Sequence, residues 1–249
     1  MANSYSIGRL FGIPIRVHVT LLIFLPLFAF SFMPVDGPQG LFYGALGAVG
    51  LFASVALHEI GHSLVARAKG SRILEILLLP IGGMARLNAL PRRPIDEIQT
   101  ALAGPAVSLV LGLAGLFGAP TVYPFNPLLA VVIHELGRIN FMLVLFNLIP
   151  SFPMDGGRVF RAALVPRMGR LPATQLAAKV GRGFAWLFGA WALLPLLKNG
   201  HVNFSLLLIA YFIHQAAGAE ARVAEMEALA DLQRGQPSGL FDDLLHKWR

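Results

Sequence analysis

The sequence predicts an all-α polytopic membrane protein with about six transmembrane helices and a short membrane-associated β element after the second. Hydrophobic residues make up 56% of the 249 residues and charged residues only 13%, whereas soluble proteins carry about 25% charged residues. A chain this apolar needs lipid as part of its solvent, and each helix that crosses a bilayer takes about 20 residues. The chain has no cysteine, which excludes disulfide frameworks, thiolate metal sites and cysteine nucleophiles.

Apolar runs predict spans at about 17–33, 41–66, 97–118, 128–149, 183–198 and 202–218. Lys and Arg alternate between the connections, because 34–40 and 119–127 contain none whereas 67–93 and 157–182 are rich in them. Basic connections stay on the cytoplasmic side of a bilayer, so the bias predicts a multi-pass protein of the cell membrane with both termini in the cytoplasm. Topology thus accounts for the net charge of +7, and no nucleic-acid partner is expected.

Two segments interrupt the pattern of spans. Residues 72–87 are apolar but broken at Pro80 and at Gly82-Gly83, which indicates a strand pair or a re-entrant element. Residues 149–158 contain two prolines and a Gly-Gly pair, so they cannot form a continuous helix. Broken backbone at membrane depth is tolerated only where protein or a water-filled cavity covers it. The segment 147–158 is therefore a candidate functional site.

Residues 1–218 are predicted to form the membrane domain, and residues 219–249 a cytoplasmic tail. Within the tail, apolar residues recur at helical spacing between acidic ones, at Val223, Met226, Leu229 and Leu232. This spacing predicts a short amphipathic helix that lies on a surface or against a partner.

The second predicted span contains the motif His58-Glu59-Ile60-Gly61-His62. On a helix, His58 and His62 are one turn apart, so both imidazoles can reach one metal ion, and Glu59 beside them can take a proton from an activated water. Imidazole ligands without thiolates suit zinc, with Co, Mn and Fe left open by ligand type. Ionisable groups in a span usually mark function, which favours a metal site over a structural hydrogen-bonding cluster.

A second motif of this kind, His134-Glu135-Leu136-Gly137-Arg138, ends in arginine where the second histidine would stand. It cannot provide a ligand pair. We interpret it as the interfacial start of a helix, with a substrate or gating role as the alternative.

Two histidines leave a catalytic zinc one protein ligand short, with an open position for water. Acidic residues are scarce in the predicted spans, because Glu59 is already assigned and Glu135 lies near an edge. Asp155, in the interrupted segment Pro153-Met154-Asp155-Gly156-Gly157, is the best candidate for the third ligand. The alternative is a turn-forming aspartate before glycines.

These motifs resemble those of the site-2 protease family of intramembrane zinc metalloproteases. The resemblance rests on His58–His62 and on the segment from Asn147 to Arg158, and it extends from about residue 8 to 217. Further matches are Gly12–His18, Gly82-Gly83 and Ala103-Gly104-Pro105. The start of the chain is most similar to the subgroup of sporulation pro-sigma-factor processing enzymes and forms with a C-terminal CBS pair, although residues 219–249 are too few for such a pair.

The resemblance implies a zinc metalloendopeptidase that binds one Zn²⁺ through His58, His62 and Asp155, with Glu59 as the catalytic base. Asn147 matches the asparagine to which the family's oxyanion stabilisation is assigned.

Substrate binding is implied by the same resemblance. Gly82 and Gly83 belong to an expected edge strand, with which an unwound substrate segment could pair, and Asn140 is a weaker candidate than Asn147 for stabilising the oxyanion. The expected substrate is a transmembrane protein, such as an anti-sigma factor or a membrane-bound pro-transcription factor. The lipid bilayer is the other expected partner, and a homo-oligomer stays open.

Two other classes of protein compete with a protease. A membrane carrier or binding protein for divalent metals would use the histidines without needing Glu59, although carriers coupled to protons usually have more acids in their spans. A catalytically silent relative acting as a scaffold is the third hypothesis. The intact motif and Asp155 argue against it.

Overall fold

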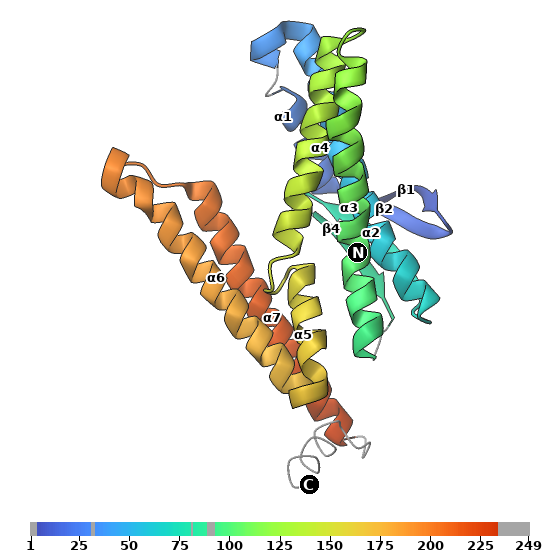
Figure 1. Ribbon diagram of the computed structural model, residues 1–249, viewed down its shortest axis with the longest axis vertical. Coiled ribbons are helices and arrows are strands. Elements are labelled where there is room, and N and C mark those ends of the chain that lie inside the picture. Colours follow the sequence, from blue (N-terminus) through green and yellow to red (C-terminus); the bar gives the residue numbers. More distant parts are fainter. Residues whose placement is uncertain (1–3, 31–32, 81, 89–92, 234–249) are drawn as a thin grey trace. The chain divides into compact units, whose positions relative to one another are not determined.

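The computed structural model describes residues 4–30, 33–80, 82–88 and 93–233, which are mostly helical (Figure 1). The elements in chain order are β1 (Ser4–Leu10), β2 (Ile13–His18), α1 (Val19–Phe30), α2 (Met33–Ala68), β3 (Ile73–Leu79), β4 (Gly82–Leu87), α3 (Pro94–Val122), α4 (Pro127–Asn147), α5 (Asp155–Met168), α6 (Arg170–Asn199) and α7 (Phe204–Gln233).

Four helical segments within the described residues are long and apolar enough to cross a membrane, at Gly37–Ala68, Pro94–Val122, Pro127–Asn147 and Phe204–Ala230. They coincide with four of the predicted spans. The span predicted at 17–33 begins instead as strand, and α1 has only 12 residues, about 18 Å at 1.5 Å per residue. The span predicted at 183–198 lies within α6, which is not among the four. The count of about six spans therefore stays a prediction.

The four strands form one sheet in the order β1-β2-β3-β4. β1 pairs with β2 and β3 pairs with β4 in antiparallel fashion, whereas β2 and β3 are parallel. β3 and β4 lie within the stretch 72–87, where a strand pair or re-entrant element is expected. β1 and β2, which precede the first helix, were not expected as strands.

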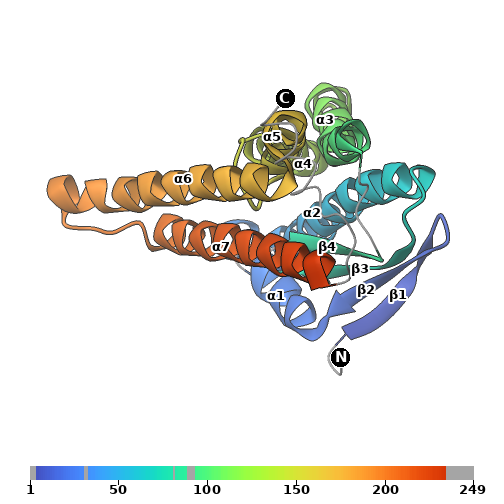
Figure 2. The same cartoon turned by 90° about the horizontal axis from the view of Figure 1, so that it is seen from below.

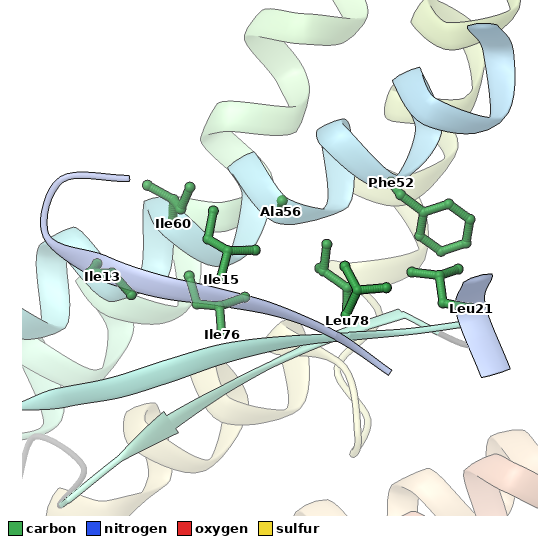
Figure 3. Packing of buried hydrophobic residues seen from close by; sticks show 9 residues of the cluster. Ile13, Ile15, Leu21, Phe52, Ala56, Ile60, Ile76 and Leu78 are labelled. Atoms are coloured by element: carbon green, nitrogen blue, oxygen red, sulfur yellow. The ribbon is translucent and has the colours of Figure 1, made fainter. Parts of the chain in front are cut away.

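One face of this sheet packs on the second half of α2. Figure 3 shows the buried side chains that join them: Ile13, Ile15, Ile76 and Leu78 from the strands meet Phe52, Ala56 and Ile60 from the helix, with Leu21 at one end. Apolar side chains on alternate strand positions produce such a face. The sheet is thus held against the turns of α2 that carry the histidine motif.

The chain divides into two compact units, one made of Met1–Arg92 and Leu102–Phe146 and the other of Arg93–Ala101 and Asn147–Arg249. In the first unit, α2 and α3 approach closely at Gly61, where a Cβ atom would lie 2.8 Å from the carbonyl oxygen of Ala103. Only a residue without a side chain allows this approach. Small residues at helix contacts are typical of membrane proteins.

In the second unit, α6 and α7 run side by side (Figure 2). Their facing surfaces are rich in alanine, and Phe152 is fully buried against Ala177, Ala178, Ala217 and Ala221. α7 continues without a break from Phe204 to Gln233, so the span predicted at 202–218 and the amphipathic stretch after it form one helix. The rest of the predicted tail, 234–249, lies outside the described residues.

Candidate metal centre

The two histidines of the motif converge on α2, as their spacing predicts. Their Nε2 atoms lie 3.0 Å apart, and each residue is only 6% exposed. Two nitrogen ligands at about 2.0–2.1 Å from one tetrahedral zinc are separated by roughly 3.3 Å. The pair is therefore close to the separation that a shared metal ion requires.

α3 completes the surroundings of this pair through two residues on successive turns. Nδ1 of His58 hydrogen-bonds with Oγ of the fully buried Ser108 at 2.9 Å. With Nδ1 as the donor, the lone pair of His58 is left on Nε2, which is the usual way in which a second residue orients a metal-binding histidine. At Gly104, a Cβ atom would lie 2.6 Å from Nε2 of His58 and closer still to Nε2 of His62. The space beside both nitrogen atoms is thus kept open, and these residues fit a zinc ion.

Glu59, which follows His58 on α2, lies against the sheet. It is half-buried, and β4 passes so close that a Cβ atom at Gly83 would lie 2.6 Å from Cγ of Glu59 and 3.2 Å from Cγ1 of Val55. Gly83, which the resemblance assigns to an edge strand for substrate, therefore adjoins the residue to which it assigns the catalytic base. Gly82 precedes it as the first residue of β4 and has a positive φ of 137°.

Asp155 belongs to the second unit, where it is the first residue of α5 and is 7% exposed. The backbone between α4 and α5 is not helical, which confirms that 149–158 is no continuous helix. Its backbone groups form hydrogen bonds within short turns instead. The N–H of Met154 donates to the Ser151 carbonyl at 2.9 Å, and the N–H of Gly157 donates to the Met154 carbonyl at 3.0 Å. An acid in the first turn also interacts favourably with the helix dipole.

The two histidines and Asp155 are all of residue types that bind metal ions. His58, His62 and Asp155 are three buried side chains of ligand type that could hold a metal ion. Two imidazoles and a carboxylate leave a fourth position on a tetrahedral zinc for water or substrate.

The two asparagines considered for oxyanion stabilisation differ in their surroundings. Asn140 is 2% exposed, and its amide nitrogen donates to Oγ of Ser54 at 3.0 Å and to the Leu136 carbonyl at 2.8 Å. Asn147 is the half-buried last residue of α4. Both hydrogens of the Asn140 amide are thus taken by the protein, which favours Asn147 for the oxyanion.

Ser108 and Ser54 were not predicted as members of the site. Ser54 lies one helical turn before His58, and Ser108 one turn after Gly104. These two spacings are the only signal in the sequence that could have pointed to them.

The second motif forms a local ion pair instead of a ligand pair. Arg138 donates to the Glu135 carboxylate at 2.6 Å on the surface of α4, and Nδ1 of His134 lies 3.7 Å from the same carboxyl group.

The apolar helices and the site define the chain as a polytopic membrane protein with a histidine-pair metal centre on one of its spans. Residues 46–134 match the model of Peptidase family M50. A zinc metalloprotease of Methanocaldococcus jannaschii is 37% identical over 92% of this chain and 64% of its own length. The stage IV sporulation protein FB of Bacillus subtilis is 27% identical over 76% of this chain and 66% of its own length. The chain thus spans just under two thirds of these curated relatives.

A solved structure extends the likeness to the fold. The site-2 protease from Methanocaldococcus jannaschii superposes with a TM-score of 0.63 at 35% identity, covering 88% of this chain and 95% of that chain. Identity at this level over nearly all of a solved relative is decisive. The chain belongs to peptidase family M50, the site-2 proteases, a family of zinc metalloproteases.

Proposed function

We propose that this chain is an intramembrane zinc metalloendopeptidase that hydrolyses a peptide bond in or near a transmembrane segment of a membrane protein. The observation that carries the proposal is the buried pair of Nε2 atoms of His58 and His62, which lie 3.0 Å apart on a candidate membrane span. Membership of a family of zinc metalloproteases supports the same reaction.

The zinc ligands in this proposal are His58, His62 and Asp155, for one ion per chain. Two observations support Asp155 as the third ligand. It is a buried carboxylate in a chain whose apolar helices contain few acids, and a carboxylate oxygen is a ligand that zinc accepts beside two imidazoles. It also begins a helix directly after a fixed break in the backbone, so its direction is set by the fold.

The bound zinc would supply Lewis acidity, which activates water and polarises a peptide carbonyl. Glu59 accepts the proton of the attacking water and returns it to the leaving amine. The side-chain amide of Asn147 donates to the oxyanion that develops on the carbonyl oxygen. Asn140 holds α4 to α2 through Ser54.

β4 is the proposed binding strand for the substrate. Among the described strands it stands at one edge of the sheet, next to β3, so its outer backbone groups can pair with an extended peptide. A helical substrate must first unwind, because its carbonyls are hydrogen-bonded within the helix. Pairing beside Gly82 and Gly83 would bring the unwound segment next to Glu59.

The proposed setting is the cell membrane, with the basic connections and both termini in the cytoplasm. The substrates expected there are transmembrane proteins such as an anti-sigma factor or a membrane-bound pro-transcription factor. The similarity to a sporulation protein supports a role in regulated proteolysis.

Replacement of Glu59 by glutamine tests the reaction. The amide keeps the shape of the side chain but cannot accept the proton, so cleavage of a model transmembrane substrate should fall by at least about 100-fold. Zinc content, measured by mass spectrometry on detergent-purified protein, should stay at the wild-type value. Glu227→Gln, on the exposed surface of α7, is the matched control and should change neither quantity.

The same experiment separates the protease from a metal carrier or a scaffold. A carrier or scaffold does not require a base at Glu59. Wild-type protein that binds zinc but cleaves no faster than Glu59→Gln would therefore refute the proposed reaction.

A further inference from the structure

A buried ion pair in the second unit has no part in the chemistry proposed above. Glu97, in the first turn of α3, and Arg161, on α5, have side chains that are 4% and 5% exposed. Nε of Arg161 donates to Oε1 of Glu97 at 2.9 Å, and Nη2 donates to the same oxygen. Arg170, at the start of α6, approaches the other carboxylate oxygen at 3.4 Å. Removing two charges from water costs several kcal/mol per ion before their attraction is counted.

Arg161 also reaches the segment that leads to Asp155. Its guanidinium carbon lies 5.0 Å from the centre of the Phe152 ring, within the range of a cation–π interaction. Phe152 is fully buried in the alanine-lined contact between α6 and α7. The guanidinium of Arg161 therefore lies between the carboxylate of Glu97 and the ring of Phe152. Phe152 is three residues before Asp155 in the chain.

The backbone around Phe152 is packed without free space. A Cβ atom at Gly157 would lie 2.5 Å from the carbonyl carbon of Ser151 and 2.6 Å from the nitrogen of Phe152. A Cβ atom at Gly181 of α6 would lie 2.8 Å from the Phe152 carbonyl oxygen. The backbone of residues 151–157 is thus closely packed, and we expect a displacement of Phe152 to be passed on to Asp155.

Through its ion pair with Arg161, Glu97 connects residues 151–157 to α3, the helix that borders the histidine pair. It lies seven residues before Gly104 on the continuous helix α3, a separation of about 10 Å along a stiff element. Gly104 adjoins Nε2 of both His58 and His62. The ion pair therefore fastens the segment that carries Asp155 to the same helix that bounds the two histidines.

We propose that Arg161, held by Glu97, is a positioning residue that sets Asp155 for metal binding. This inference rests on the proposed function, in which Asp155 is the third ligand. A purely structural tie between helices would affect the unfolding temperature alone. A positioning role also changes the affinity and the ligand geometry of the metal.

The test uses the full chain in detergent and the metal alone as probe. The main variant is the double substitution Glu97→Gln with Arg161→Gln, which removes both charges and leaves neither buried alone. Zinc affinity is measured by competition with a chelator, and the absorption spectrum of the Co²⁺-loaded protein reports the ligand geometry. We expect zinc binding to weaken about 10- to 100-fold, the usual effect of losing a residue that orients a metal ligand. The Co²⁺ spectrum should shift in the same direction as that of Asp155→Asn.

Arg167→Gln, at an exposed position of the same helix, is the control and should keep wild-type affinity and spectrum. A folded double variant that keeps the wild-type zinc affinity and Co²⁺ spectrum would overturn the inference, whatever its melting temperature. If the double variant does not fold, Arg161→Lys replaces it, since lysine keeps the charge but not the planar group over Phe152. A folded lysine variant that binds zinc as the wild type does would overturn the inference equally.

Asp155→Asn separates this inference from the proposed function. Unchanged zinc affinity and Co²⁺ spectrum in Asp155→Asn would refute the ligand assignment itself. A changed spectrum there beside a wild-type one in the double variant would refute only the positioning role.

Discussion

Gly104 has no side chain, and this leaves room beside the two histidines of the candidate metal centre. The ideal Cβ position at this residue is 2.6 Å from Nε2 of His58 and nearer still to Nε2 of His62, well inside van der Waals contact. A methyl group would therefore occupy the space that a metal ion needs, or force both imidazoles to turn away from each other. The nearby Ser108 holds His58 from its other nitrogen at 2.9 Å, which limits how far that ring can turn.

We predict that Gly104→Ala abolishes zinc binding while the protein still folds. Alanine favours the helix by about 0.5–1 kcal/mol over glycine, so any loss of metal is not a loss of helical propensity. The measurement is zinc content by mass spectrometry beside the melting temperature. Gly118→Ala makes the same change on α3 where a Cβ atom meets nothing within 4 Å, and it should retain zinc. Zinc bound by Gly104→Ala at the wild-type level would show that the metal does not lie beside these nitrogen atoms.

The residues that the sequence could identify are those whose partners are local. His58 and His62 are one helical turn apart, so their convergence follows from helix geometry alone. The contact between His58 and Ser108 joins residues that are 50 positions apart, and a serine in an apolar helix has no pattern that distinguishes it. The family resemblance already ranked Asn147 above Asn140, and the hydrogen bonds of the Asn140 amide add a physical reason that the sequence does not contain.

At the scale of elements, β4 is the strand that lies next to Glu59, the proposed catalytic base. It is an edge strand among the described strands, and its Gly83 leaves room for the side chain of Glu59. Successive residues of a strand point to opposite faces, so Gly83 faces α2 while its neighbour Met84 is 44% exposed. In the proposed function, the strand would therefore bind a substrate along its edge and position Glu59 with one face.

We predict that Gly83→Val reduces cleavage without loss of zinc. A Cβ atom there would lie 2.6 Å from Cγ of Glu59, and valine would displace that side chain from its position. A misplacement of about 1 Å in a catalytic group can cost about 100-fold in rate, so a fall of 10- to 100-fold in the cleavage of a model substrate is expected. Met84→Val, on the other face of β4, should cleave normally. Cleavage by Gly83→Val at the rate of Met84→Val would contradict the role of this strand.

The sheet was only half predictable, for a physical reason. Residues 72–87 show apolar runs broken by Pro80 and Gly82-Gly83, which is a local signal for two strands. β2 pairs in parallel with β3, and the helices α1 and α2 lie between these two strands in the chain. Such pairing is non-local, and Ile13–His18 are too few to be separated by pattern from the apolar run that follows.

At the scale of the whole molecule, the proposed ligands come from both compact units. His58 and His62 belong to one unit and Asp155 to the other. The motif and the interrupted segment could each be found in the sequence, and their joint use as ligands is part of the proposed function. A metal ion bound to all three side chains would act as a cross-link between segments far apart in the chain. Because the three ligands come together only in the folded chain, zinc binding would stabilise the folded state.

We therefore predict that zinc raises the melting temperature of the wild-type protein and that a chelator lowers it. A ligand that binds only the folded state stabilises it by RT ln(1 + [L]/Kd), about 2.7 kcal/mol at a free zinc concentration of 100 Kd. His58→Ala removes one ligand, so its melting temperature should respond far less to the same zinc concentration. Asp155→Ala should respond less as well, because the second unit no longer contributes a ligand. A wild-type melting temperature that is insensitive to zinc and chelator would contradict the prediction. A response of equal size in His58→Ala would mean that the stabilising metal is bound elsewhere.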